Sequence, residues 1–148
     1  RSASGVRGIT LANEQDEVVG MVAVNDMDAN ILVVSENGFG KRSSLDDYRT
    51  TNRGGKGVKT ISVTEKTGAL VTLKSVTDLD DLMIINKSGI AIRMAVSDLR
   101  VMGRATQGVK LINIKGNDSI AAVAKTMKDD EEVEDVSDID VENGTIIE

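Results

Sequence analysis

The sequence repeats itself at a fixed spacing of 51 residues. Residues 31–63 align with residues 82–114 without a gap, and residues 5–9 match residues 57–61 of the same unit. The identical pairs of the full copies are Gly38/Gly89, Arg42/Arg93, Asp47/Asp98, Arg49/Arg100, Arg53/Arg104, Gly57/Gly108, Val58/Val109, Lys59/Lys110 and Ile61/Ile112. Repeats of this length are typical of arrays in which each unit buries its faces against its neighbours. We therefore expect a chain that begins inside one repeat and belongs to a longer array.

Each repeat is predicted to form short β-strands. Val, Ile and Thr are dense, and apolar runs of strand length end at Asn37-Gly38 and Ser88-Gly89. Such dipeptides favour hairpin turns because Gly tolerates a positive φ. We predict strands at Ile31–Ser35, Phe39–Arg42, Val58–Thr64 and Ala69–Val76, and at the matching Leu82–Asn86, Ile90–Met94, Val109–Ile114 and Ser119–Thr126. Val18–Val24 is the predicted last strand of the partial copy, and Leu45–Tyr48 and Val96–Leu99 each fit one helical turn.

About four short strands in a repeat of about 50 residues is the size of a propeller-type blade. The predicted fold class is therefore all-β, built from antiparallel blades. Residues 1–30 are assigned to the end of a preceding blade and its linker, residues 31–80 and 81–128 to one blade each, and residues 129–148 to an acidic tail. Two blades and a piece form an open fragment and not a closed ring.

The chain contains no Cys and no His, and its aromatic residues are Phe39 and Tyr48. The absence of Cys excludes disulfides and cysteine zinc sites, and the absence of His removes the commonest general base near pH 7. With so few rings, stacking of exposed bases is not expected, which argues against single-stranded nucleic acid as the main ligand. No stretch approaches the roughly 20 apolar residues of a membrane span and no signal peptide is visible, so we expect a cytoplasmic chain without a membrane partner.

The charges are segregated along the chain. Residues 1–128 hold all 18 Lys and Arg against 14 acidic residues, a net charge of +4, whereas Asp129–Glu148 holds ten acidic residues and no basic one. We expect this tail to be disordered, or to dock at most a short segment such as Thr145–Ile147. It either competes with an anionic partner for the basic body or serves as a solubilising tail.

The loop from Tyr48 to Val58 combines three glycines with three cations, and similar loops occupy residues 103–110 and 1–7. Gly allows a close approach of the backbone, Arg supplies a fork that fits phosphate, and Lys supplies a mobile charge. A single such loop could be a solvated turn, but its repetition predicts a cationic track along one rim. The candidate contacts to a phosphate backbone are Lys41, Arg42, Arg49, Arg53, Lys56, Lys59, Arg93, Arg100, Arg104 and Lys110, with loop glycines Gly54, Gly55, Gly57, Gly103 and Gly108.

Two other features invite a catalytic interpretation. Tyr48 could act as a nucleophile, but it aligns with Leu99 in the next repeat, which favours a packing role. The acidic groups Asp26/Asp28 and Asp78/Asp80/Asp81 could hold a divalent cation, but they fall between predicted strands and lack EF-hand spacing, which favours exposed turns. No catalytic residue and no metal ligand is therefore predicted.

Three segments, Asn37–Arg42, Asn52–Val58 and Val101–Val109, resemble the last two blades of the C-terminal domain of the bacterial DNA gyrase A protein. The resemblance covers about residues 1–127, and an acidic tail follows in that family too. It implies a six-bladed β-pinwheel with strand exchange between blades and a basic outer rim that wraps duplex DNA. Arg53–Gly57 matches the end of the family's box, Gln-Arg-Arg-Gly-Gly-Lys-Gly, but Thr51 and Asn52 depart from its start. We interpret the loop as a related blade linker, with the box itself upstream of Arg1.

The resemblance also implies a role and partners. Non-specific wrapping of double-stranded DNA would support ATP-dependent negative supercoiling by a parent type II topoisomerase, a heterotetramer completed by the rest of the gyrase A protein and by the gyrase B protein. No cofactor is expected in this chain, because ATP, Mg²⁺ and the catalytic Tyr would belong to sites elsewhere in the parent. The alternatives are the C-terminal domain of topoisomerase IV and a propeller-type protein-interaction module. The absence of His and Cys argues against a free-standing enzyme.

Overall fold

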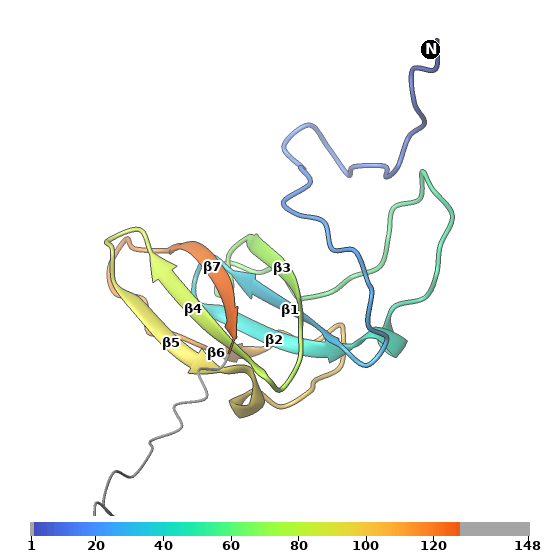
Figure 1. The fold of residues 1–148 in the computed structure, drawn as a ribbon. Coiled ribbons are helices and arrows are strands. Elements are labelled where there is room, and N and C mark those ends of the chain that lie inside the picture. The colour runs from blue at the N-terminus through green and yellow to red at the C-terminus, as the bar shows by residue number, and fades with distance from the viewer. Residues whose placement is uncertain (1, 128–148) are drawn as a thin grey trace, which may run out of the picture.

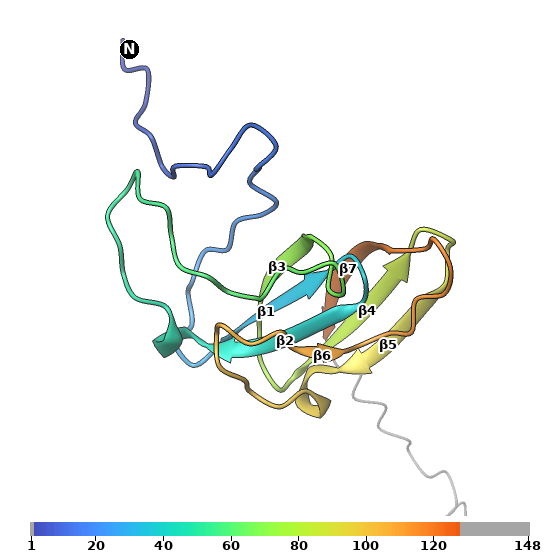
Figure 2. The same ribbon diagram turned by 180° about the vertical axis from the view of Figure 1, so that it is seen from behind.

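The computed structural model describes residues 2–127, which form two antiparallel sheets. The first sheet has the strand order β3-β1-β2-β6 and the second the order β5-β4-β7. The sheets lie against each other, while the N-terminal segment and the loop between η1 and β3 extend to one side (Figures 1 and 2). The elements in chain order are β1 (Asn30–Ser35), β2 (Phe39–Ser44), the 3-10 turn η1 (Leu45–Asp47), β3 (Leu70–Val76), β4 (Asp80–Asn86), β5 (Ala91–Ala95), the 3-10 turn η2 (Val96–Asp98), β6 (Val109–Lys110) and β7 (Ile120–Met127).

Each repeat contributes one tight hairpin, β1–β2 or β4–β5. Gly38 and Gly89 occupy the turns with φ values of +83° and +89°, a region that other residues adopt only with strain. In the second turn, the Asn86 side-chain oxygen accepts hydrogen bonds from the Ile90 amide at 2.7 Å and the Ser88 hydroxyl at 3.0 Å. The dipeptides that predicted these hairpins therefore form the turns.

The core lies between the two sheets. Leu32 and Val34 of β1 pack against Leu82 and Ile84 of β4, and all four side chains are fully buried. Ile31 and Val33 point to the opposite face, since successive residues of a strand alternate, and form a second cluster with Ile61. Burial of each such aliphatic side chain stabilises the fold by about 1.5–3 kcal/mol. Both faces of the first sheet are thus used for packing.

Strand β6 joins the two repeats. It belongs to the second repeat but pairs with β2 of the first, with Lys110 opposite Phe39 and Val109 opposite Gly40. The pairing continues at Leu111, whose amide donates to the Gly38 carbonyl at 2.8 Å. A Cβ atom on Gly108 would lie 2.6 Å from the Gly40 carbonyl oxygen, so the two backbones approach this closely only because Gly108 has no side chain.

The prediction of an all-β chain is confirmed. The predicted hairpin strands, and the predicted last strands of the two full repeats, agree with the observed ones to within two residues at each end. The 3-10 turns also lie where single helical turns were predicted. The predictions for Val18–Val24 and Val58–Thr64 were wrong, and Val109–Ile114 is reduced to β6, because among residues 2–127 these segments find no further strand to pair with. The predictions for the tail, Asp129–Glu148, lie outside the described residues.

In the part of the chain that the structure describes, no helix has the length and apolarity needed to cross a membrane.

Candidate nucleic-acid interface

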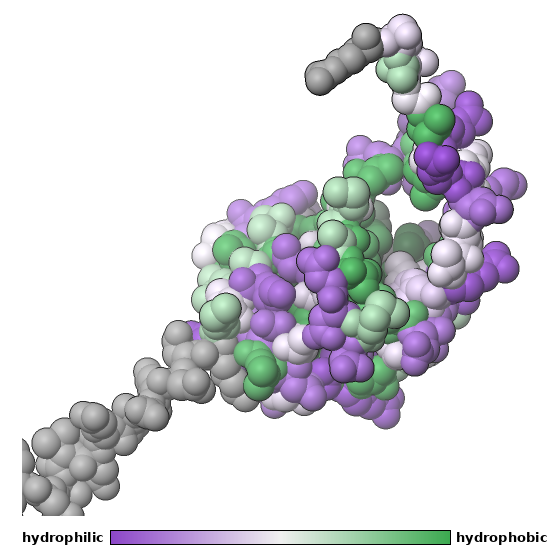
Figure 3. Space-filling model, turned by 45° about the vertical axis from the view of Figure 1, so that its right-hand side comes forward, coloured by the Kyte–Doolittle hydropathy of each residue, from purple (hydrophilic) through white to green (hydrophobic). Residues whose placement is uncertain are grey.

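The Gly-rich loop, residues 48–58, projects from the sheets beside the N-terminal segment (Figures 1 and 2). The Gly54 amide donates to the Gly8 carbonyl and the Thr10 amide donates to the Gly55 carbonyl, both at 2.9 Å. Gly54 has a φ of +80°, which lets the loop reverse direction at this contact. The outer side of this projecting part is largely hydrophilic in Figure 3. The loop is therefore a defined, exposed structure held by backbone hydrogen bonds.

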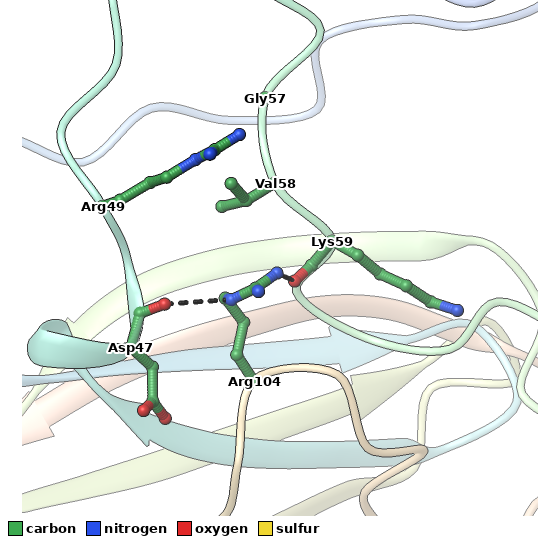
Figure 4. Close-up of a pocket in the computed structure, with 6 residues that line it drawn as sticks. All are labelled: Asp47, Arg49, Gly57, Val58, Lys59 and Arg104. Carbon is green, nitrogen blue, oxygen red and sulfur yellow. Dashed lines mark hydrogen bonds between the residues drawn. The ribbon is translucent and has the colours of Figure 1, made fainter.

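A cationic pocket of about 420 Å³ opens at the base of this loop. Three cations line it, Arg49, Lys59 and Arg104, together with Asp47, Gly57 and Val58 (Figure 4). Arg49 extends toward Gly57, and the carboxylate of Asp47 points away from the Arg104 guanidinium. The Lys59 side chain points away from both arginines, so the guanidinium groups of Arg49 and Arg104 supply the forked donors of this pocket. Such forks fit phosphate oxygens.

Arg104 comes from the loop of the second repeat and bridges the two ends of the Gly-rich loop. Its Nε donates to the Asp47 carbonyl at 3.0 Å and its Nη1 donates to the Lys59 carbonyl. Asp47 immediately precedes the loop and Lys59 immediately follows it. The pocket is therefore built by two repeats together, and one guanidinium fixes both of its sides.

Lys41 is fully buried between the repeats, which corrects its prediction as a DNA contact. Its Nζ donates to the carbonyl of Gly103 at 2.6 Å, to the carbonyl of Arg104, and to the hydroxyl of Thr106 at 3.2 Å. Burial, together with the charge of Arg104, lowers the pKa of Lys41 to about 8, and the charge of Asp47 opposes this shift. The amine thus holds the loop of the second repeat in place.

Arg42 also lies in the junction and not on a DNA-accessible surface, contrary to its prediction. Its Nε donates to the Leu99 carbonyl and its Nη1 pairs with the Asp78 carboxylate. Both corrections have one cause: β6 and the segment before it cover the edge of β2, so a strand that looks like an exposed basic hairpin in the sequence lies inside an interface. The aligned Arg93 remains exposed and pairs with Asp81 at 2.8 Å.

The other predicted contacts are at the surface. Five of them belong to the loops and their ends, namely Arg49, Arg53, Lys56, Lys59 and Arg100, and all are exposed. Lys110 is exposed on β6, where it shares a second pocket with Lys66, a residue that the sequence interpretation missed. The Lys66 amine lies 5.4 Å from the centre of the Phe39 ring. Lys66 stands alone between predicted strands, so no local pattern marks it.

The loop glycines fall into two groups. Gly54, Gly57 and Gly108 have positive φ values of 80–82°, so their backbone conformations favour Gly. Gly55 and Gly103 do not, and a Cβ atom on either would meet no atom closer than 3.5 Å. The first group therefore shapes the loops, whereas the second is not required by backbone strain or crowding.

The features that invited a catalytic interpretation have structural partners. Tyr48 packs against the cluster of Ile31, Val33 and Ile61, and its hydroxyl shares a hydrogen bond with Thr60. Asp80 accepts a hydrogen bond from the Thr77 amide at 2.8 Å, which closes the turn between β3 and β4. Within residues 2–127, no three acidic residues gather in an arrangement that could hold a metal ion.

Comparison with known proteins places this chain in a family. The family model described as "DNA gyrase C-terminal domain, beta-propeller" matches residues 1–25, 29–77 and 80–127. The DNA gyrase A protein of Staphylococcus aureus (strain MRSA252) is 48% identical over 148 residues, which are 98% of this chain and 16% of that protein. The gyrase A protein of Chlamydia muridarum (strain MoPn / Nigg) is 43% identical over 148 residues, which are 100% of this chain and 18% of that protein. The chain therefore spans less than a fifth of these relatives.

Solved structures show the same fold. A DNA gyrase A C-terminal domain superposes with a TM-score of 0.75 at 28% identity, over 83% of this chain and 41% of that one. The C-terminal domain of a DNA topoisomerase IV gives a TM-score of 0.76 at 21% identity, over 83% of this chain and 38% of that one, a likeness of fold alone. The family model matches nearly all of residues 1–127, the repeats pair through β6, and the sequence is 43–48% identical to gyrase A proteins. This chain therefore belongs to the C-terminal β-pinwheel domain family of DNA gyrase A.

Proposed function

We propose that the chain binds duplex DNA without sequence preference, through phosphates that contact the Gly-rich loop and the cationic pocket at its base. The observation that carries the proposal is an open pocket lined by three cationic residues, Arg49, Lys59 and Arg104, in which the Asp47 carboxylate points away from the Arg104 guanidinium. Neutralisation of phosphates with release of counterions supplies most of the affinity of such surfaces. The exposed contacts proposed are Arg49, Arg53, Lys56, Lys59, Arg93, Arg100 and Lys110, with the half-buried Arg104 beside them.

In the parent enzyme, this surface would contribute to the wrapping of DNA that supports ATP-dependent negative supercoiling. Smooth bending of 20–30 base pairs by 40–90° costs about 1–6 kcal/mol, so a full wrap needs the contacts of several blades. The chain spans less than a fifth of its relatives, and the cationic pocket is built from only two repeats. We therefore expect weak binding and no full wrap by this chain alone.

The test is a salt titration of binding to a labelled duplex by fluorescence anisotropy. If about four phosphates are neutralised, log K should fall with log salt at a slope of about −3.6. The double variant Arg49→Gln/Lys59→Gln should weaken binding and make that slope shallower by about 1.8, because two phosphate contacts are lost.

The matched control removes the same charge elsewhere. Lys87 and Lys115 are exposed residues of the second repeat that do not line the pocket. The variant Lys87→Gln/Lys115→Gln should keep the slope of the unmodified chain. Equal losses in both double variants would show that only total charge matters and would refute a defined phosphate site.

A further inference from the structure

The Gly-rich loop leaves the sheets at η1 and returns to them after Lys59, so its shape depends on how these two ends are held. Arg104 donates to a backbone carbonyl at each end, Asp47 and Lys59. The guanidinium is a rigid planar fork, so two hydrogen bonds from it fix both acceptors relative to each other. A lysine at this place would keep the charge but could not impose that geometry.

Arg104 is itself held by a buried amine. Lys41 donates to the carbonyls of Gly103 and Arg104, and its third partner, the Thr106 hydroxyl, donates to the Gly103 carbonyl at 3.0 Å. A buried amine without acceptors is costly, so Lys41 favours the one position of the Gly103–Thr106 segment that supplies them. Ser62 contacts the same segment from the other side, since its hydroxyl donates to the Ala105 carbonyl at 3.1 Å.

We propose that Lys41 and Arg104 form a latch between the repeats: Lys41 fixes Arg104, and Arg104 closes the base of the preceding Gly-rich loop so that Arg49 and Lys59 line one pocket. Both are positioning residues, and Lys41 acts on the interface without touching it. The link to DNA affinity rests on the proposed function, whereas the closure of the loop does not.

The repeat alignment gives an independent observation. Arg53 aligns with Arg104, and the segment after Arg53 contacts residues 8–10 much as Ala105 and Thr106 contact Ser62. An arginine thus recurs where one loop meets the preceding repeat. Lys41 aligns with Ile92, so the second repeat does not carry the amine half of the latch.

The first test measures the loop directly, by amide hydrogen exchange in the full chain. The variant Arg104→Lys keeps the charge and removes the fork. It should speed exchange of the Tyr48 and Gly54 amides about tenfold, as expected for the loss of charge-assisted hydrogen bonds, while the β1 amides keep their protection. Lys41→Met should act on the same amides. Arg53→Lys, the aligned conservative change, should leave Tyr48 unaffected.

The second test measures DNA affinity in the same variants. Arg104→Lys should weaken binding about fivefold to tenfold without changing the salt slope, because the number of charges is constant. The double variant Lys41→Met/Arg104→Lys should bind no more weakly than Arg104→Lys alone, since both act through one latch.

The outcomes are distinguishable. Unchanged exchange at Tyr48 and Gly54 in Arg104→Lys would overturn the latch, whatever happens to DNA binding. Faster loop exchange with unchanged affinity would overturn its role in positioning the contacts. If the unmodified chain binds no DNA, the proposed function fails while the exchange measurement still decides the latch. If Lys41→Met does not fold, as judged by loss of β1 protection, Arg104→Lys decides alone.

Discussion

Strands β2 and β5 occupy the same place in two copies of one repeat, yet they end their sheets differently. The free edge of β2 receives β6, whereas β5 remains an edge strand among the described residues. Their sequences differ where the added strand approaches: Gly40 and Lys41 in β2 correspond to Ala91 and Ile92 in β5. The edge of β2 thus provides space and a side-chain hydrogen-bond donor for the incoming segment, and the aligned residues of β5 provide neither.

The space is measurable at Gly40. A Cβ atom there would lie 2.5 Å from Cδ1 of Leu111 and 2.8 Å from the carbonyl oxygen of Val33. Ala91 carries such an atom at the aligned position, so β5 is not shaped to receive a strand with a leucine in the same geometry. An exposed edge strand can pair with other chains. Steric restrictions at the edge, such as the Cβ atom of Ala91, limit which strand can pair there.

The largest effect is expected from Gly108→Ala. Gly108 has a φ of +82°, and a Cβ atom would meet the Gly40 carbonyl oxygen at 2.6 Å. Backbone strain and overpacking should together lower the free energy of unfolding by about 2–4 kcal/mol. Urea unfolding followed by circular dichroism measures this change.

Gly57→Ala is the matched control for that variant. Gly57 aligns with Gly108 and has nearly the same φ, +81°, but no atom lies within 4 Å of its would-be Cβ. Gly57→Ala should lower the free energy of unfolding by about 1 kcal/mol, through backbone strain alone. Equal losses in the two variants would mean that the close approach of the two backbones adds nothing to the junction.

A smaller effect is expected from making β2 resemble β5. Gly40→Ala should lower the free energy of unfolding by about 1–3 kcal/mol, because the Val33 carbonyl belongs to a paired strand and cannot retreat as easily as the Leu111 side chain. The reverse change, Ala91→Gly, should cost about 0.5–1 kcal/mol through strand entropy alone. A loss in Ala91→Gly as large as that in Gly40→Ala would contradict the comparison.

The same comparison separates what the sequence could predict from what it could not. The hairpins were predictable because Asn37-Gly38 and Ser88-Gly89 fix a turn through local conformational preference. The pairing of β6 with β2 of the other repeat joins Gly40 and Val109, which are far apart in the chain. No local sequence pattern specifies that partner. For the same reason Val18–Val24 has the composition of a strand without forming one among the described residues.

The interface was predicted in part. Arg49 belongs to the Gly-rich loop and Lys59 follows it, and both line the pocket. Both could be predicted because the Gly-rich, basic composition of this segment is a local pattern. Lys41 and Arg42 were predicted as contacts from their charge, but both are buried. The sequence pattern of a strand does not indicate which segment covers its edge. The contact of Arg104 with the Gly-rich loop could not be predicted, because it depends on which loops lie side by side. That arrangement follows from the pairing of β6 with β2.

The smallest expected effect is a dependence of the free energy of unfolding on pH that arises from Lys41 of β2. The aligned residue of β5, Ile92, has no titratable group. Burial, assisted by Arg104 and opposed by Asp47, lowers the pKa of Lys41 from 10.5 to about 8 in the folded chain. Between these values the unfolded chain binds more protons than the folded one, so the contribution of Lys41 to the free energy of unfolding rises with pH. Below pH 8 both states are protonated and the cost of the buried charge is fully present.

Urea unfolding at pH 7.5 and pH 9 of the unmodified chain and of Lys41→Met measures this contribution as a difference of differences, from which other titrating groups cancel. Between the two pH values, the free energy of unfolding of the unmodified chain should rise by about 1 kcal/mol more than that of Lys41→Met. Lys87→Met, which removes an exposed lysine from the turn after β4, controls for the loss of a charge. Two outcomes would show that the Lys41 amine keeps its proton in the junction. In one, the rise in the free energy of unfolding relative to Lys87→Met equals the rise relative to Lys41→Met. In the other, the free energy of unfolding falls relative to Lys41→Met between pH 7.5 and pH 9. The three acceptors around Nζ would then outweigh the cost of burial, and β2 would hold the second repeat by a permanent charge.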